Sequence, residues 1–305
     1  MIELVGLTKT FGSKTAVDNL TVNIRPGHVT GFLGPNGAGK STTMRMILGL
    51  DWPTSGKVLI DGKPLAQTRA PLTVIGALLD AKAVPRQCSG RDYLIGMAMT
   101  HGLSRRRVDQ VIDLTGLHAV IGNRFKTYSL GMSQRLGIAA SLLGDPEIVM
   151  MDEPVNGLDP EGVAWVRALA HQLAAEGRTV FLSSHLMSEM AQTADHLLII
   201  GQGRLLADTP VDEFLRQSSE VATWVRSPQA SEIAAALSSP TVRATMDTPG
   251  EVVLHGLDPL GVGERLAPHN WVITGLTPLT VSLEDAYLRL TDPSVEYRSA
   301  TTWMR

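Results

Sequence analysis

The chain contains little cysteine, few aromatic residues and no long apolar run. Its single cysteine, Cys88, cannot form an internal disulfide and has no metal-ligand spacing around it, which indicates a reducing compartment. The apolar runs at residues 136–143 and 197–200 are far shorter than the ~18 residues that a membrane-spanning helix needs. Residues 1–6 begin at once as a strand, without the basic and apolar regions of a signal peptide. We therefore expect a cytoplasmic protein that reaches a membrane only through a partner.

An excess of positive charge is also missing. The 27 Lys and Arg residues against 30 Asp and Glu residues leave a formal net charge of −3. Because nucleic-acid-binding surfaces are strongly basic, no nucleic-acid partner is expected. The three arginines at residues 105–107 are interpreted as the solvated start of a helix, with a contact to a phosphate backbone as the alternative.

The 305 residues are more than one core usually accommodates, which favours two domains. Residues 2–24 alternate in the manner of antiparallel strands, whereas 148–151 and 179–182 are continuous apolar runs typical of central parallel strands. Residues 89–144 have helical spacing and turn breaks. The pattern predicts an α/β domain over 1–217, with an antiparallel β subdomain, a parallel-sheet core and an inserted helical lobe at 89–144.

The remaining residues, 218–305, predict a small C-terminal accessory or regulatory α+β domain. Its strands and helices are expected in the order of a split βαβ, ferredoxin-like unit, followed by a closing helix. The expected strands are 221–225, 242–246, 252–254 and 271–273, and the expected helices are 229–237, 260–266 and 283–290.

A glycine-rich loop follows the apolar segment 29–33 and precedes a segment with helical spacing. In that context its glycines expose backbone N–H groups that can wrap a phosphate chain, and the helix adds its positive end. We expect Lys40 to neutralise phosphate charge, Ser41 to bind Mg²⁺ and Thr42 to contact a phosphate oxygen. The alternative is a glycine-rich turn with a surface lysine. The expected nucleotide contacts are Gly34, Pro35, Asn36, Gly37, Ala38, Gly39, Lys40, Ser41 and Thr42.

Polar side chains end two of the apolar strands. Asp152 and Glu153 follow residues 148–151, at the strand edge where ligands of open α/β sheets bind. There Asp152 is expected to hold Mg²⁺, and Glu153 to orient and polarise the water that attacks the γ-phosphate. His185 follows 179–182 and is expected to contact the γ-phosphate, with a purely structural hydrogen bond as the alternative.

These residues resemble the ATP-binding cassette (ABC) ATPases over residues 2–217, with the motifs in the expected order. Phe11 is similar to the aromatic residue that stacks on adenine, although a core phenylalanine is the alternative. The segment 128–135 resembles the family's signature loop, in which Ser129, Gly131 and Met132 are the implied nucleotide contacts. The segment 156–159, with Asp159, resembles the loop that communicates between subunits, and His185 the switch histidine.

Two positions depart from the family pattern. Leu130 stands where the signature loop usually has the first of two glycines, which predicts a less close approach of that backbone to a γ-phosphate. Asp80 stands where a glutamine usually meets Mg²⁺, and its contact with the metal is expected to pass through water. Both variants resemble bacterial cassettes that serve drug, antibiotic or lantibiotic export and immunity.

The resemblance implies an ATPase of an exporter that uses ATP and Mg²⁺. One chain carries one phosphate loop and one signature loop, so a second copy of itself is the implied partner, with a nucleotide between the copies. A separate membrane permease is the other implied partner and would hold the protein at the inner face of the membrane. The alternative is a soluble cassette protein acting on ribosomes or nucleic acid. A kinase or metabolic enzyme would leave the signature loop unexplained.

Overall fold

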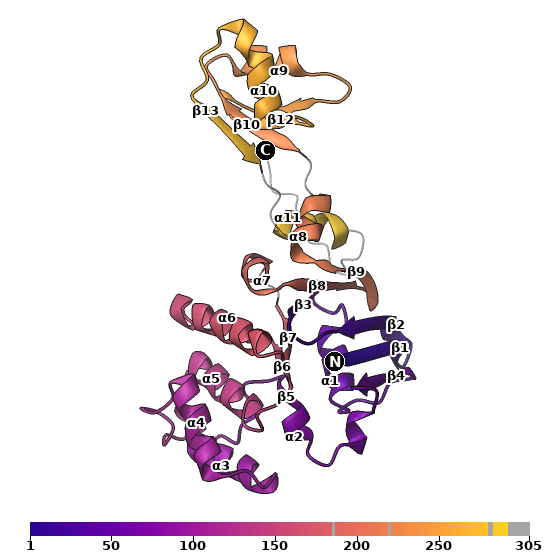
Figure 1. Ribbon diagram of the computed structural model, residues 1–305, viewed down its shortest axis with the longest axis vertical. Coiled ribbons are helices and arrows are strands. Elements are labelled where there is room, and N and C mark those ends of the chain that lie inside the picture. The colour runs from indigo at the N-terminus through magenta and orange to yellow at the C-terminus, as the bar shows by residue number, and fades with distance from the viewer. Residues whose placement is uncertain (185–186, 219–220, 280–282, 292–305) are drawn as a thin grey trace. The chain divides into compact units, whose positions relative to one another are not determined.

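A computed structural model describes residues 1–184, 187–218, 221–279 and 283–291. The chain forms two compact units: one is Met1–Val211 together with the described residues from Arg289 on, and the other is Asp212–Leu288 (Figure 1). Within the described ranges no helix has the length and apolarity needed to cross a bilayer.

The N-terminal unit contains a three-stranded antiparallel sheet in the order β2 (Lys14–Ile24), β1 (Ile2–Phe11), β4 (Ser55–Ile60). Ile2 pairs with Ile24 on one side and with Ile60 on the other, and all three side chains are buried. Alternate residues of β2 face the core, as the alternation in the sequence predicts.

A six-stranded sheet forms the centre of this unit. Its order is β5 (Ile75–Leu78), β6 (Ile148–Asp152), β7 (Thr179–Ser183), β3 (Val29–Leu33), β8 (His196–Gly201), β9 (Arg204–Pro210). The five strands β5, β6, β7, β3 and β8 run parallel. β9 pairs antiparallel with β8, so the sheet is mixed. β3 and β7 are buried throughout, and the rings of Phe32 and Phe181 lie 5.1 Å apart between them. Continuous apolar runs in the sequence thus form the central parallel strands.

The helices of this unit are α1 (Lys40–Ile47), α2 (Pro71–Val74), α3 (Gly90–Thr100), α4 (Arg105–Thr115), α5 (Leu130–Ser141), α6 (Pro160–Ala175) and α7 (Met187–Thr193). Short 3₁₀ turns lie at Leu65–Gln67 and Phe125–Thr127. Figure 1 shows α3, α4 and α5 on one side of the central sheet and the three-stranded sheet on the other.

Serine side chains cap the N-termini of the three helices in the helical lobe. Ser89, Ser104 and Ser129 accept hydrogen bonds from the backbone at the starts of α3, α4 and α5. The arginine run opens α4 as expected, but Arg107 also donates to the carbonyls of Leu142 and Leu143. Arg107 therefore caps the carbonyl end of α5.

The C-terminal unit has a four-stranded antiparallel sheet in the order β11 (Arg243–Thr245), β12 (Glu251–His255), β10 (Ala222–Arg226), β13 (Gly275–Leu279). Its helices are α8 (Val211–Ser218), α9 (Ala230–Leu237), α10 (Pro259–Leu266) and α11 (Leu283–Thr291), with a 3₁₀ turn at Ala267–His269. Its core includes Val225, Ile233, Val252, Leu254 and Val262.

One strand of this unit was wrongly placed by sequence reasoning. The prediction of a strand at 271–273 is wrong, because β13 lies at Gly275–Leu279. Trp271 instead stacks on His269 at 4.3 Å, and the Val272 N–H donates to the Gln229 side chain. Pro278 lacks the N–H of a ladder residue, so the sequence disfavours a strand there. Among the described strands β13 lies at the edge of the sheet, next to β10, where a missing N–H is tolerated.

Gly76 is a position where the packing of β5 against α5 can be tested. A Cβ at Gly76 would overlap the Ser141 carbonyl and lie 2.9 Å from Pro146 Cγ. Because backbone cannot yield cheaply, we expect Gly76→Ala to lower the free energy of unfolding by about 1–3 kcal/mol. The measurement is the urea midpoint of the full chain at unchanged m-value.

Gly96 in α3 supplies the matched control, since a Cβ there would meet nothing within 4 Å. Gly96→Ala should raise stability by about 0.5–1 kcal/mol through helix propensity. An unchanged midpoint for Gly76→Ala would contradict the close packing of β5 on α5.

Candidate nucleotide-binding site

The glycine-rich loop connects the buried strand β3 to helix α1. Gly39 has φ 106°, a left-handed conformation, and a Cβ at this position would overlap the Ala16 carbonyl. A Cβ at Gly34 would lie 2.6 Å from the carbonyl oxygen of Ile200. Both positions therefore require glycine, for backbone conformation at Gly39 and for space at both. The loop opens α1, whose N-terminal N–H groups form an anion site.

Lys40 is buried, with 8% of its surface exposed. Its Nζ donates to the carbonyl of Gly34 at 2.6 Å and to that of Pro35 at 3.3 Å. Burial lowers the pKa of the Lys40 ammonium, while the carboxylates of Glu153 and Asp152 oppose that shift. A desolvated ammonium beside the loop is suited to an anionic ligand, because phosphate oxygens compensate its burial.

Asp152 is held from two directions at the end of β6. Ser41 Oγ donates to Asp152 Oδ2 at 2.9 Å, and Ser183 Oγ donates to Asp152 Oδ1. Ser183 lies opposite Asp152 in the β6–β7 pairing and opposite Phe32 in the β3–β7 pairing. β7, which lies between β6 and β3, thus supplies the fully buried Ser183 hydroxyl that orients the Asp152 carboxylate.

Ser183 was not singled out from the sequence. Its only signal was its place at the end of an apolar strand, in the segment predicted to deliver a polar tip to this edge.

Glu153 lies next to Asp152 with φ 51°, which is uncommon for a residue with a side chain. Its N–H donates to Ser183 Oγ at 3.0 Å and to the Ser183 carbonyl at 3.3 Å. The backbone therefore turns sharply after β6, directly beside the glycine-rich loop.

A cavity of about 260 Å³ joins these elements. The loop, the start of α1 and the end of β6 line it together, as the motif order predicts. Its lining residues are Ala16, Pro35, Asn36, Gly37, Ala38, Gly39, Lys40, Ser41, Thr42, Asp152 and Glu153. The sequence did not predict that Ala16, near the start of β2, lines the cavity.

The hard oxygen donors of Ser41 and Asp152 suit Mg²⁺, which takes few protein ligands. No cluster of three or more His, Cys, Asp or Glu side chains that could hold a metal by themselves occurs among the residues that the structure describes. A metal here would need substrate or water oxygens as further ligands.

Other expected contacts lie outside this cavity. Phe11 ends β1 with 52% of its surface exposed, and Lys9 Nζ lies 4.9 Å from its ring centroid. Asp80 is exposed and accepts from the Lys82 N–H at 2.8 Å. The expected role of His185 falls outside the described residues.

The signature-like segment also lies outside the cavity of its own chain. Ser129 is exposed and caps α5 by accepting from the Met132 N–H at 3.2 Å. Gly131 lies against the neighbouring loop, since its Cβ would be 3.1 Å from the Gly157 carbonyl. Asp159 is exposed and caps α6 by accepting from the Gly162 N–H at 2.8 Å.

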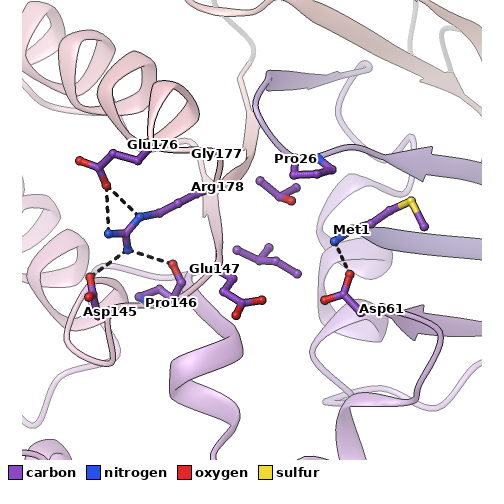
Figure 2. A pocket seen from close by; sticks show the side chains of 11 residues that line it. Met1, Pro26, Asp61, Asp145, Pro146, Glu147, Glu176, Gly177 and Arg178 are labelled. Atoms are coloured by element: carbon purple, nitrogen blue, oxygen red, sulfur yellow. Dashed lines mark hydrogen bonds and ion pairs between the residues drawn. The ribbon is translucent and has the colours of Figure 1, made fainter.

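A larger pocket of about 430 Å³ is unsuited to a nucleotide (Figure 2). The Arg178 guanidinium pairs with Asp145 and Glu176, and the N-terminal ammonium pairs with Asp61. Glu147 adds a further carboxylate to the lining, so acidic groups outnumber basic groups there. Phosphate groups would be repelled from this pocket, whereas the glycine-rich loop attracts them.

Comparison with known proteins agrees with this site. The family model described as ABC transporter matches residues 17–156, and a model of a domain of unknown function (DUF8746) matches residues 222–284. The chain is 41% identical over 221 residues to the bacitracin transport ATP-binding protein BcrA of Bacillus licheniformis, covering 72% of each. It is 37% identical to the uncharacterized ABC transporter ATP-binding protein YhcH of Bacillus subtilis (strain 168), covering 97% of each. The lantibiotic transport ATP-binding protein SrtF of Streptococcus pyogenes is 34% identical, with 70% of this chain and 92% of that protein covered.

Solved structures agree in fold. An ATP-binding subunit of an ABC transporter has a TM-score of 0.65 at 25% identity, covering 71% of this chain and 92% of the other. The dimeric bacterial ABC transporter cassette MJ0796 has a TM-score of 0.64 at 23% identity, covering 69% and 99%. From the glycine-rich loop, the acidic strand end and these relatives together, the chain belongs to the ABC transporter family as an ATP-binding subunit that hydrolyses ATP.

Proposed function

We propose that the chain is the ATPase subunit of a bacterial exporter, that it works as a homodimer on a separate membrane permease, and that the cargo is a drug, an antibiotic or a related compound. The names of its relatives, which include bacitracin and lantibiotic transport proteins and a Nod factor export protein, support this cargo class. The permease would hold the protein at the inner face of the cell membrane.

One observation carries the proposal. Lys40, Asp152 and Glu153 line a single cavity, while Ser129 and Asp159 lie outside it in the same chain. A nucleotide at the loop would therefore meet the first set in its own subunit and the second set only in another copy. A homodimer supplies both sets at two equivalent sites.

The polar residues of the cavity, together with Asp80 and His185, would divide the steps of hydrolysis. Lys40 and the start of α1 would bind the phosphate chain, with contacts from residues 34–42. Ser41 and Asp152 are the residues that would hold Mg²⁺, which would neutralise phosphate charge, and Asp80 would act on the metal through water. Glu153 would orient and polarise the attacking water. His185 would contact the γ-phosphate.

The second copy would complete the site. Ser129, Gly131 and Met132 would contact the γ-phosphate across the interface, and Asp159 would communicate between the copies. Phe11 would stack on adenine, for which its exposed ring is accessible. ATP binding would then close the dimer, and hydrolysis would open it and move the permease.

For the C-terminal residues we propose a ferredoxin-like accessory domain over 218–305, joined to a cassette over 1–217. The strand order β11-β12-β10-β13 supports it, with α9 between β10 and β11 and α10 between β12 and β13.

Glu153→Gln tests the chemical step. The amide keeps the shape of the side chain but cannot accept a proton, so hydrolysis should fall at least about 100-fold while ATP affinity is retained. With ATP and Mg²⁺ the variant should accumulate as a dimer, measured by light scattering. Glu161→Gln, at the exposed start of α6, is the matched control. Wild-type turnover in Glu153→Gln would remove Glu153 from this role.

Mixing two inactive variants tests whether the site is shared. Lys40→Ala removes the phosphate-binding charge, and Ser129→Asp keeps a helix cap while repelling the γ-phosphate. Each alone should be inactive. A mixture should recover about a quarter of wild-type turnover, because half of the dimers would hold one intact site of two. Absence of recovery would place Lys40 and Ser129 in one chain's site, and full recovery would also contradict the arrangement.

The permease can be sought directly. Tagged chain, expressed in a bacterial host together with its neighbouring reading frames, should co-purify an integral membrane protein from detergent-solubilised membranes. The Glu153→Gln variant should co-purify it equally well, because that substitution leaves the outer surface unchanged. A chain found solely with ribosomes would favour the soluble alternative.

A further inference from the structure

A buried glutamine joins helix α5 to the backbone of Glu153. Gln134 is only 5% exposed, and its Nε2 donates to the Glu153 carbonyl at 2.9 Å. Its Oε1 is also buried and has no hydrogen-bond partner among the described residues. A buried amide with one unsatisfied oxygen is costly, and the bond that its Nε2 donates to Glu153 offsets part of that cost.

The backbone of Glu153 is fixed on both sides of its Cα. Its N–H donates to the hydroxyl and carbonyl of Ser183 on β7. Its carbonyl accepts from the Gln134 side chain on α5 at 2.9 Å and from the Asn156 N–H at 3.2 Å, so Gln134 supplies the bond that joins it to α5. Between these contacts the residue has φ 51°. Because backbone conformation restricts the side-chain rotamers, these contacts fix the direction of the Cα–Cβ bond and limit the positions open to the carboxylate.

Gln134 is itself part of the signature segment 128–135. It lies on α5, which begins just after its cap Ser129. Helix geometry makes the spacing between Ser129 and Gln134 nearly rigid. A displacement of the cap therefore moves the Gln134 amide, and with it the hydrogen bond to Glu153.

We propose that Gln134 is a positioning residue for hydrolysis. It holds the Glu153 main chain so that the carboxylate faces the attacking water, and it makes that orientation depend on the position of the signature helix in the same chain. Contact of Ser129 with the partner's nucleotide would thereby adjust the chain's own Glu153. This inference rests on the proposed role of Glu153.

Two variants separate positioning from structural support. Gln134→Met keeps the length of the side chain without the donor, so kcat should fall about five- to tenfold with KM within twofold. Gln134→Glu can donate only when protonated, since an ionised carboxylate would face the carbonyl oxygen. Its kcat, relative to wild type, should be highest near pH 6 and fall as pH rises, because burial raises the pKa of a carboxyl group. The measurement is steady-state ATP hydrolysis by the full chain across pH.

Ser141→Ala is the matched control on the same helix, since the Ser141 hydroxyl donates to the Ile138 carbonyl of that helix at 2.8 Å. It should leave kcat unchanged. Wild-type kcat in Gln134→Met, or a Gln134→Glu profile parallel to wild type, would overturn the inference. The pH profile compares the kcat of one variant, Gln134→Glu, at different pH values. It therefore tests the positioning role even if Gln134→Met folds poorly. Failure of the proposed function would appear differently, as unaltered hydrolysis in Glu153→Gln.

Discussion

The site depends on how the buried ammonium group of Lys40 is compensated. An amine taken from water must be compensated, and here two loop carbonyls do so at 2.6 and 3.3 Å while two carboxylates lie nearby. That arrangement requires a loop that turns tightly on glycine and a strand order that brings β6 close to β3. It also explains why phosphate is the matching ligand, because a multiply charged anion compensates the ammonium better than neutral carbonyls.

Much of this site could be predicted because its parts are contiguous in the chain. The loop at 34–41 combines spacing, a preceding apolar strand and a following helix within about twenty residues, so local pattern alone identifies it. Asp152 and Glu153 are similar, since continuous apolar runs predict buried parallel strands and ligands bind at their carboxyl ends. The two segments are distant in the chain but come close in space, because a single strand, β7, lies between β6 and β3 in the sheet.

Other features could not be predicted, since they depend on contacts between distant segments. Ser183 orients Asp152 only because of the register between β6 and β7, and Gln134 reaches Glu153 only because α5 packs where it does. Neither residue type is diagnostic at its position. The strand at 275–279 was missed for a related reason, since Pro278 is tolerated there only as part of an edge strand.

The departure at Leu130 has a structural explanation. A Cβ at Gly157, where φ is 74°, would overlap the Leu130 side chain, so the leucine packs directly on the 156–159 loop. One turn further along α5, the Arg135 guanidinium lies 4.5 Å from the ring centroid of Trp165 on α6. The start of α5 is thus joined to the loop and to the helix that follows it. A glycine at position 130 would leave the backbone of the signature segment with more conformational freedom. The leucine restricts that backbone and adds an apolar packing contact within the chain. In this protein the signature segment and the 156–159 loop are therefore in direct packing contact, so a displacement of either one must be accommodated at Leu130 and Gly157.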